Sequence, residues 1–162
     1  MKRLLSITIL FVLIIISVVP VKIYAQHEST DTKHIFANAR SLKWQKGPAS
    51  LPAGAKLAVL EGDMTKAEPF TVRLLFPANY KVHPHWHPAI EHVTVIQGAL
   101  YMGTGESFNM ATAKKLSAGD FATMPIRYAH YAFTKGKTII QLHGVGPWGI
   151  TYINAADDPR NK

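Results

Sequence analysis

The chain has 162 residues, with 18 Lys and Arg against 10 Asp and Glu, a formal net charge of +8 at pH 7, and no cysteine. The lack of cysteine excludes disulfides, a lipoprotein anchor, and thiolate nucleophiles or metal ligands. The basic residues are scattered rather than clustered, which argues against a nucleic-acid-binding surface.

Residues 1–25 have the pattern of a secretory signal peptide. The basic start Met1-Lys2-Arg3 precedes an uncharged, mostly apolar run from Leu4 to Val21, and Ala25 is a small residue before the predicted cleavage site. The alternative is an uncleaved membrane anchor, because the run is near the lower length limit for spanning a bilayer. We expect cleavage before Gln26, no stable membrane association afterwards, and a periplasmic or extracellular protein.

The remaining chain divides into an arm, a strand-rich region and a tail. Residues 26–54 are polar and Pro- and Gly-interrupted, which predicts an N-terminal arm that packs on the main domain or on a partner subunit. Residues 55–153 consist of short apolar runs separated by turn residues, at 56–60, 70–76, 92–97, 99–102, 121–124, 128–133, 138–145 and 148–153. Strands this short at regular intervals predict a single all-β sandwich or barrel. Residues 154–162 are charged and contain a proline, which predicts a C-terminal tail.

Four residues in the strand-rich region have the chemistry of a metal site. His85 and His87 are two residues apart, so in an extended strand both side chains leave the same face. Glu91 opens the next apolar run, and His130 lies in a later one. Three imidazole nitrogens and one carboxylate leave room for water or substrate on a divalent metal. This ligand set fits iron, manganese, nickel, copper or zinc, and does not fit calcium, which prefers oxygen ligands.

The spacing of these residues resembles the two sequence motifs of the cupin superfamily. The segment His85-x-His87-x3-Glu91-x6-Gly98 is similar to the first motif, and Gly119-x5-Pro125 followed by His130 is similar to the second. The resemblance implies a small jelly-roll β-barrel over residues 55–153 whose interior metal is held by the two histidines, the glutamate and the later histidine. It also implies a homodimer paired through an edge strand.

The chain departs from the family pattern at three positions. Asn79 and Arg127 stand where the motifs usually have glycine, and Thr134 stands where the second motif usually has asparagine.

Other polar residues near the motifs were weighed as ligands or substrate contacts. His92 has the opposite strand parity to Glu91 and should point away from the metal. His83 shares the parity of His85 and is expected at the barrel rim. His143 and Gln141 share one strand face and would contact a ligand if that face lines the cavity. Arg73 is expected to face solvent, with anchoring of an anionic substrate as the alternative.

Two classes of function fit these residues. The first is an exported metal-dependent enzyme acting on a small molecule. Apart from Glu91 no acidic residue near the motif can act as a general base, which favours chemistry run by the metal over acid–base chemistry. Oxygenase-like chemistry with a redox-active metal is favoured over Lewis-acid isomerisation by analogy with the fold. The second is a cupin that captures a small ligand or senses a metal without catalysis. Family resemblance does not choose between them, because one fold hosts many functions.

Overall fold

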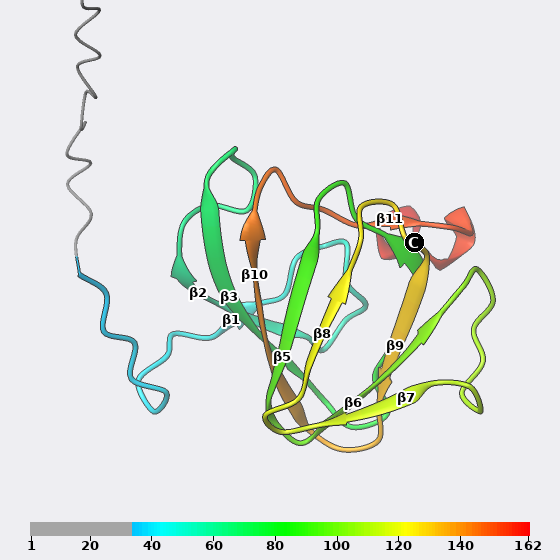
Figure 1. Cartoon of the computed structure of the whole chain (residues 1–162), viewed down its shortest axis with the longest axis horizontal. Coiled ribbons are helices and arrows are strands. Elements are labelled where there is room, and N and C mark those ends of the chain that lie inside the picture. Colours follow the sequence, from blue (N-terminus) through cyan, green and yellow to red (C-terminus); the bar gives the residue numbers. More distant parts are fainter. Residues whose placement is uncertain (1–33) are drawn as a thin grey trace, which may run out of the picture. The chain divides into compact units, whose positions relative to one another are not determined.

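The computed structural model describes residues 34–162 as an all-β domain, so the predicted signal peptide lies outside the described residues (Figure 1). Its strands are β1 (Gln45–Lys46), β2 (Lys56–Glu61), β3 (Pro69–Phe76), β4 (Lys81–Trp86), β5 (Glu91–Gln97), β6 (Ala99–Thr104), β7 (Lys114–Ser117), β8 (Phe121–Met124), β9 (His130–Thr134), β10 (Thr138–Val145) and β11 (Thr151–Tyr152). Two short 3-10 helices, η1 (Ala155–Asp157) and η2 (Pro159–Asn161), end the chain. Within residues 34–162 no helix has the length and hydropathy needed to cross a bilayer.

The strands form two antiparallel sheets that face each other, which confirms the predicted jelly-roll architecture. One sheet has the order β1-β2-β3-β10-β5-β8 and the other the order β11-β4-β9-β6-β7. Several neighbours in each sheet are distant in sequence, as β3 beside β10 and β4 beside β9 show. Figure 1 shows the loops after β4, β8 and β10 at one end of the sandwich.

The strand faces follow the two-residue alternation expected of a half-buried sheet. In β3, Phe70, Val72 and Leu74 are buried, and the residues between them are half-buried. In β5, Glu91, Val93 and Val95 are buried, whereas His92 and Thr94 are half-buried on the other face. This outcome confirms the register predicted for β5.

Part of the predicted N-terminal arm is built into the sandwich. Residues 45–46 pair with the start of β2, and Leu51 belongs to the hydrophobic core. The segment of residues 48–52, here called the strap, is held by two tyrosine hydroxyls. Tyr80 donates to the Pro52 carbonyl, and Tyr152 donates to the Ser50 carbonyl at 2.8 Å. The strap is therefore fixed to the sheet that contains β4 and β11.

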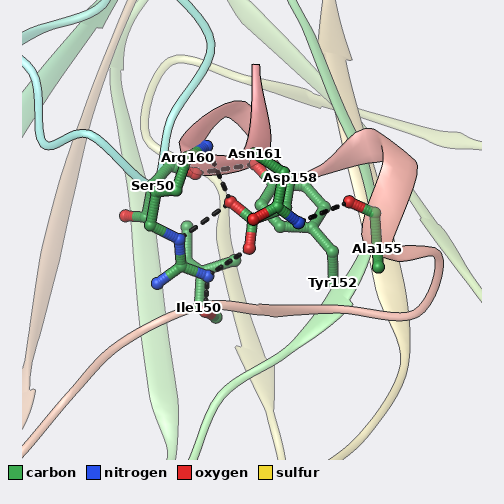
Figure 2. Close-up of polar contacts among 7 residues, drawn as sticks. All are labelled: Ser50, Ile150, Tyr152, Ala155, Asp158, Arg160 and Asn161. Atoms are coloured by element: carbon green, nitrogen blue, oxygen red, sulfur yellow. Dashed lines mark hydrogen bonds and ion pairs between the residues drawn. The ribbon is translucent and has the colours of Figure 1, made fainter.

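The C-terminal residues are folded rather than extended. The Arg160 guanidinium pairs with the Asp158 carboxylate at 2.6 Å and donates to the Ile150 carbonyl at 3.1 Å (Figure 2). The Asn161 amide donates to the Ala155 carbonyl at 2.9 Å. The Arg160 contact with Ile150 ties the predicted tail back onto the segment that precedes β11, and the other two contacts hold the tail in its own turns.

Candidate metal centre

The two sheets bring the four predicted site residues together. His85 on β4 lies directly opposite His130 on β9 in the same sheet. His87 follows the end of β4, and Glu91 begins β5 in the facing sheet. The site therefore lies between the two sheets, and residues from both form it.

The four side chains are buried and close to one another. Each imidazole offers one ring nitrogen, and the three nitrogens lie within 4.8 Å of one another. The Glu91 carboxylate lies 3.1 Å from Nε2 of His130 and 3.6 Å from Nε2 of His87. All four residues are at most 6 % exposed. Ligand atoms on one metal ion are expected roughly 3–4 Å apart, so these side chains converge on one site.

Backbone carbonyls orient all three imidazole rings. Nδ1 of His85 donates to the His83 carbonyl at 2.7 Å, and Nδ1 of His130 donates to the Tyr128 carbonyl at 2.9 Å. Nδ1 of His87 donates to the Gly149 carbonyl at 2.7 Å. A carbonyl oxygen only accepts, so each Nδ1 carries the hydrogen. The neutral rings therefore present the lone pair of Nε2, which is the tautomer a metal requires.

Burial and the neighbouring charges set the protonation of the cluster. Burial, followed by the neighbouring imidazoles His130 and His87, lowers the pKa of His85 to about 3. Burial also lowers the pKa of His87. Burial by itself would raise the pKa of Glu91, but the adjacent imidazoles outweigh it and lower that pKa. Burial would likewise lower the pKa of His130, but its pairing with Glu91 outweighs this effect and raises it.

The donor set fits a divalent cation. Nε2 of His87 and one carboxylate oxygen of Glu91 are buried without a hydrogen-bond partner among the described residues. With Nδ1 protonated, neutral His130 and ionised Glu91 place two acceptor atoms 3.1 Å apart. Two buried acceptors in contact need a proton or a cation between them. A metal ion would replace that proton and satisfy the unpaired atoms, so metal binding would release a proton.

Trp148 is a site residue that the sequence analysis did not single out. Its indole stacks on the His87 ring, with centroids 4.2 Å apart and an interplanar angle of 18°. Its Nε1 is buried and has no hydrogen-bond partner in residues 34–162. The position lies 61 residues beyond His87, so no local pattern links the two. The one local signal was a large aromatic residue between two turn-forming residues, Pro147 and Gly149, which suggests that the ring is needed for packing.

Four of the polar residues named with the motifs, His92, His143, Gln141 and Arg73, lie on the outer face of one sheet. His143 stacks on His92, with ring centroids 4.9 Å apart, on the outer face of their sheet. Arg73 lies on the same outer face, where its Nε donates to Gln141 Oε1 at 3.1 Å. The face of β10 that lines the interior carries Ile140 and Leu142 instead.

The parity argument for His83 was wrong. The pairing of β4 with β9 shifts register between Val82 and His85, because β4 contains one extra residue there. Both Val82 and His85 therefore face the interior, and His83 points outward. There it lies 3.7 Å from the Asp157 carboxylate and 5.2 Å, between ring centroids, from Phe108. A β-bulge reverses the faces of the residues that follow it.

Two of the departures from the family motifs keep the backbone conformation of glycine. Asn79 has φ of 60° and Arg127 has φ of 58°, both in the left-handed region that favours glycine. Arg127 also donates its backbone N–H to the His87 carbonyl at 2.9 Å, and its guanidinium lies over the Trp86 ring. The turn beside the site is therefore preserved without its usual residue.

Comparison with known proteins identifies the fold family. Residues 69–143 match the family model described as Cupin. The chain matches no curated protein. Among solved structures it is similar to the polyketide cyclase RemF from Streptomyces resistomycificus, with 12% identity over 80% of this chain and 92% of that chain and a TM-score of 0.64. It is also similar to a candidate acetylacetone dioxygenase from Methylibium petroleiphilum, with 15% identity over 79% of this chain and 86% of that chain and a TM-score of 0.59. A third similar structure is an RmlC-like cupin from Shewanella frigidimarina, with 18% identity over 72% of this chain and 94% of that chain and a TM-score of 0.54.

Identities this low establish the fold and leave the chemistry to the site. The family match, the two facing sheets and the three-histidine group agree with one another. The chain is therefore a small cupin with a buried histidine cluster that can hold a metal ion.

Proposed function

We propose that this protein is a metal-dependent, oxygenase-like enzyme whose divalent metal is held by His85, His87, His130 and Glu91. The observation that carries the proposal is the orientation of the three rings. Each Nδ1 is bound to a backbone carbonyl, which leaves three Nε2 lone pairs beside one buried carboxylate. Without a cation, His130 and Glu91 must share a proton and Nε2 of His87 stays buried and unpaired, which is unfavourable.

The residues of the site have distinct roles in this proposal. The three neutral imidazoles supply donor atoms, and Glu91 neutralises one of the two positive charges of the metal. Trp148 holds the His87 ring by stacking, and the apolar wall excludes water. When bound, the metal supplies a position for an oxygen donor and, if it is redox active, electrons for dioxygen chemistry. No second acidic or basic side chain among the lining residues is available for proton transfer.

The names of two similar structures support an enzyme of this kind at the level of the fold. One is described as a candidate acetylacetone dioxygenase and the other as a polyketide cyclase. Both act within the same architecture as this chain, and that similarity alone does not transfer a substrate.

Metal analysis and dioxygen consumption test the proposal. The purified protein should hold close to one metal ion per chain, and the iron-, manganese- or nickel-loaded form should consume dioxygen with a panel of phenols and diketones. Glu91→Gln keeps the shape of the side chain and removes its charge, so it should lose turnover by more than it loses metal. The matched control is His92→Ala, which removes an imidazole one residue away on the outer face. Loaded wild-type protein that is inert toward the whole panel would favour a ligand-binding or metal-sensing role.

The proposal includes export from the cytoplasm. Its support is the basic start and apolar run of residues 1–25. Mass spectrometry of the mature protein should find an N-terminus at Gln26, and an intact N-terminus in the membrane fraction would support the anchor instead.

A further inference from the structure

The interior of the sandwich contains a cavity whose wall is almost entirely apolar. It is open to solvent at one side, and twenty side chains line it. Four of these are the candidate metal ligands. The other sixteen are all aliphatic, Pro, Met, Phe or Trp side chains, so the wall carries no hydroxyl, amide, Lys or Arg group.

The nearby cations are engaged elsewhere. Arg73 is on the outer face of its sheet, bound to Gln141. Arg127 lies over the ring of Trp86, with its guanidinium carbon 5.3 Å from the ring centroid. Arg160 donates to a main-chain carbonyl and pairs with an aspartate of the C-terminal turns. None of these three arginines lines the cavity, so none can neutralise an anionic group of a ligand inside it.

The charge of the proposed centre allows one anionic donor. Three neutral imidazoles and one carboxylate on a divalent ion leave a net charge of about +1. One phenolate or enolate oxygen would neutralise this charge. Any further carboxylate or sugar hydroxyl on the ligand would meet only the apolar wall. Burying such a group without a polar partner is unfavourable, and much more so if the group is ionised.

Trp148 forms part of the wall. The Trp148 indole N–H is buried and unpaired among the described residues, and its ring stacks on His87. The ring, not the N–H, forms this part of the wall, so a hydrocarbon group of the ligand can pack against it without needing a polar partner.

We infer that the site takes a small hydrophobic molecule that binds through a phenol or enol oxygen and carries no other ionised group. This inference rests on the proposed function, because it takes the metal as bound. It excludes dicarboxylates, sugar acids and phosphorylated sugars as ligands.

A matched pair of ligands tests the inference without turnover. 4-Methylcatechol and 3,4-dihydroxybenzoate carry the same metal-binding oxygens and differ by a methyl group against a carboxylate of similar size. Calorimetric titration of the zinc-loaded protein, in which the redox-inert metal avoids oxidation of the catechol, should show roughly 100-fold tighter binding of 4-methylcatechol. Zinc content measured after the titration checks that the catechol has not removed the metal.

A cation placed in the wall should reverse the preference. Met64 lines the cavity from the loop between β2 and β3 and is half-buried, so a flexible side chain there can adjust. Met64→Lys should strengthen binding of 3,4-dihydroxybenzoate by tenfold or more, and the neutral variant Met64→Gln should not.

The outcomes separate the two proposals. Failure of the wild type to bind zinc would overturn the metal site itself. Zinc-loaded protein that binds 3,4-dihydroxybenzoate as tightly as 4-methylcatechol, or binds neither, would overturn the inferred ligand class and leave the metal site standing.

Discussion

Metal binding should stabilise the folded chain by a predictable amount. The ligands come from three strands and one loop of two sheets, so an ion they share links the sheets in the native state and not in the unfolded chain. At a free metal concentration about 100 times Kd, the free energy of unfolding should rise by about 2.7 kcal/mol. At roughly 2 cal/mol/K of unfolding entropy per residue, residues 34–162 give about 0.3 kcal/mol per kelvin, so Tm should rise by about 10 °C.

Thermal denaturation of chelator-treated protein, with and without added metal, measures this shift. His87→Asn removes one ligand nitrogen from the site, and Glu91→Gln removes the carboxylate while conserving its volume. His87→Asn should lose most of the metal-dependent rise in Tm, and Glu91→Gln, which keeps all three imidazole donors, should lose a smaller part of it. His92→Ala is the control, because His92 is next to Glu91 in sequence but faces outward against His143, and it should keep the full rise. An unchanged rise in both ligand variants, or no rise in the wild type, would refute the assignment of these residues.

Three further predictions concern protonation, close packing and the strap. The pKa of His85 is lowered to about 3, so between pH 8 and pH 5 the unfolded chain gains a proton that the native imidazole does not. In urea denaturation of metal-free protein, the free energy of unfolding should therefore decrease by about 2 kcal/mol from this group as the pH is lowered from 8 to 5. The raised pKa of His130 acts in the opposite direction and offsets part of this decrease. Gly103→Ala should destabilise the fold by more than about 2 kcal/mol, because a Cβ there would overlap the ring of buried Tyr131; a change below half of that in chemical denaturation would contradict the packing described. Tyr152→Phe should cost about 1 kcal/mol, because it leaves a strap carbonyl without its donor, and an unchanged denaturation midpoint would show that the hydroxyl does not anchor the strap.

The fold was predictable because most strands are bounded in the sequence by turn-forming residues. Short apolar runs ended by Gly, Pro or Asn marked most strands, and the alternation in β5 placed Glu91 inside and His92 outside. The grouping of the site residues was also predictable, since His85 and His87 share a face and the second motif places His130 on the strand that pairs with β4.

The features that were missed depend on contacts made far along the chain. The bulge in β4 turned His83 outward. Its sequence signal was Pro84, because proline within a sheet is confined to edge strands, first strand positions or bulges, and the parity argument did not use it. The arm was predicted to pack on the main domain or on a partner subunit, but the sequence did not show which contacts it makes: Leu51 lies in the core, and Ser50 is bound by a tyrosine 102 residues later. Alternation within one segment cannot reveal such long-range partners.

The orientation of the three imidazoles shows where the sequence motif stops being sufficient. His85 and His130 each bond to the carbonyl two residues earlier, so the local strand geometry orients them. His87 instead depends on the Gly149 carbonyl and on stacking against Trp148, both beyond residues 69–143 that match the family model. This segment is held in turn by a hydrogen bond that the backbone N–H of Trp148 donates to the Met64 carbonyl at 2.7 Å.

The C-terminal turns complete this support. Arg160 donates to the carbonyl of Ile150, one residue after the carbonyl that orients His87. A cupin motif with correct spacing therefore supplies the donor atoms of this centre. The alignment of one of its three imidazoles comes from the last segment of the chain, which also contributes Trp148 and Ile150 to the wall of the cavity. Under the proposed function, metal binding and choice of ligand would be coupled through residues 148–150, because the same segment orients His87 and lines the cavity.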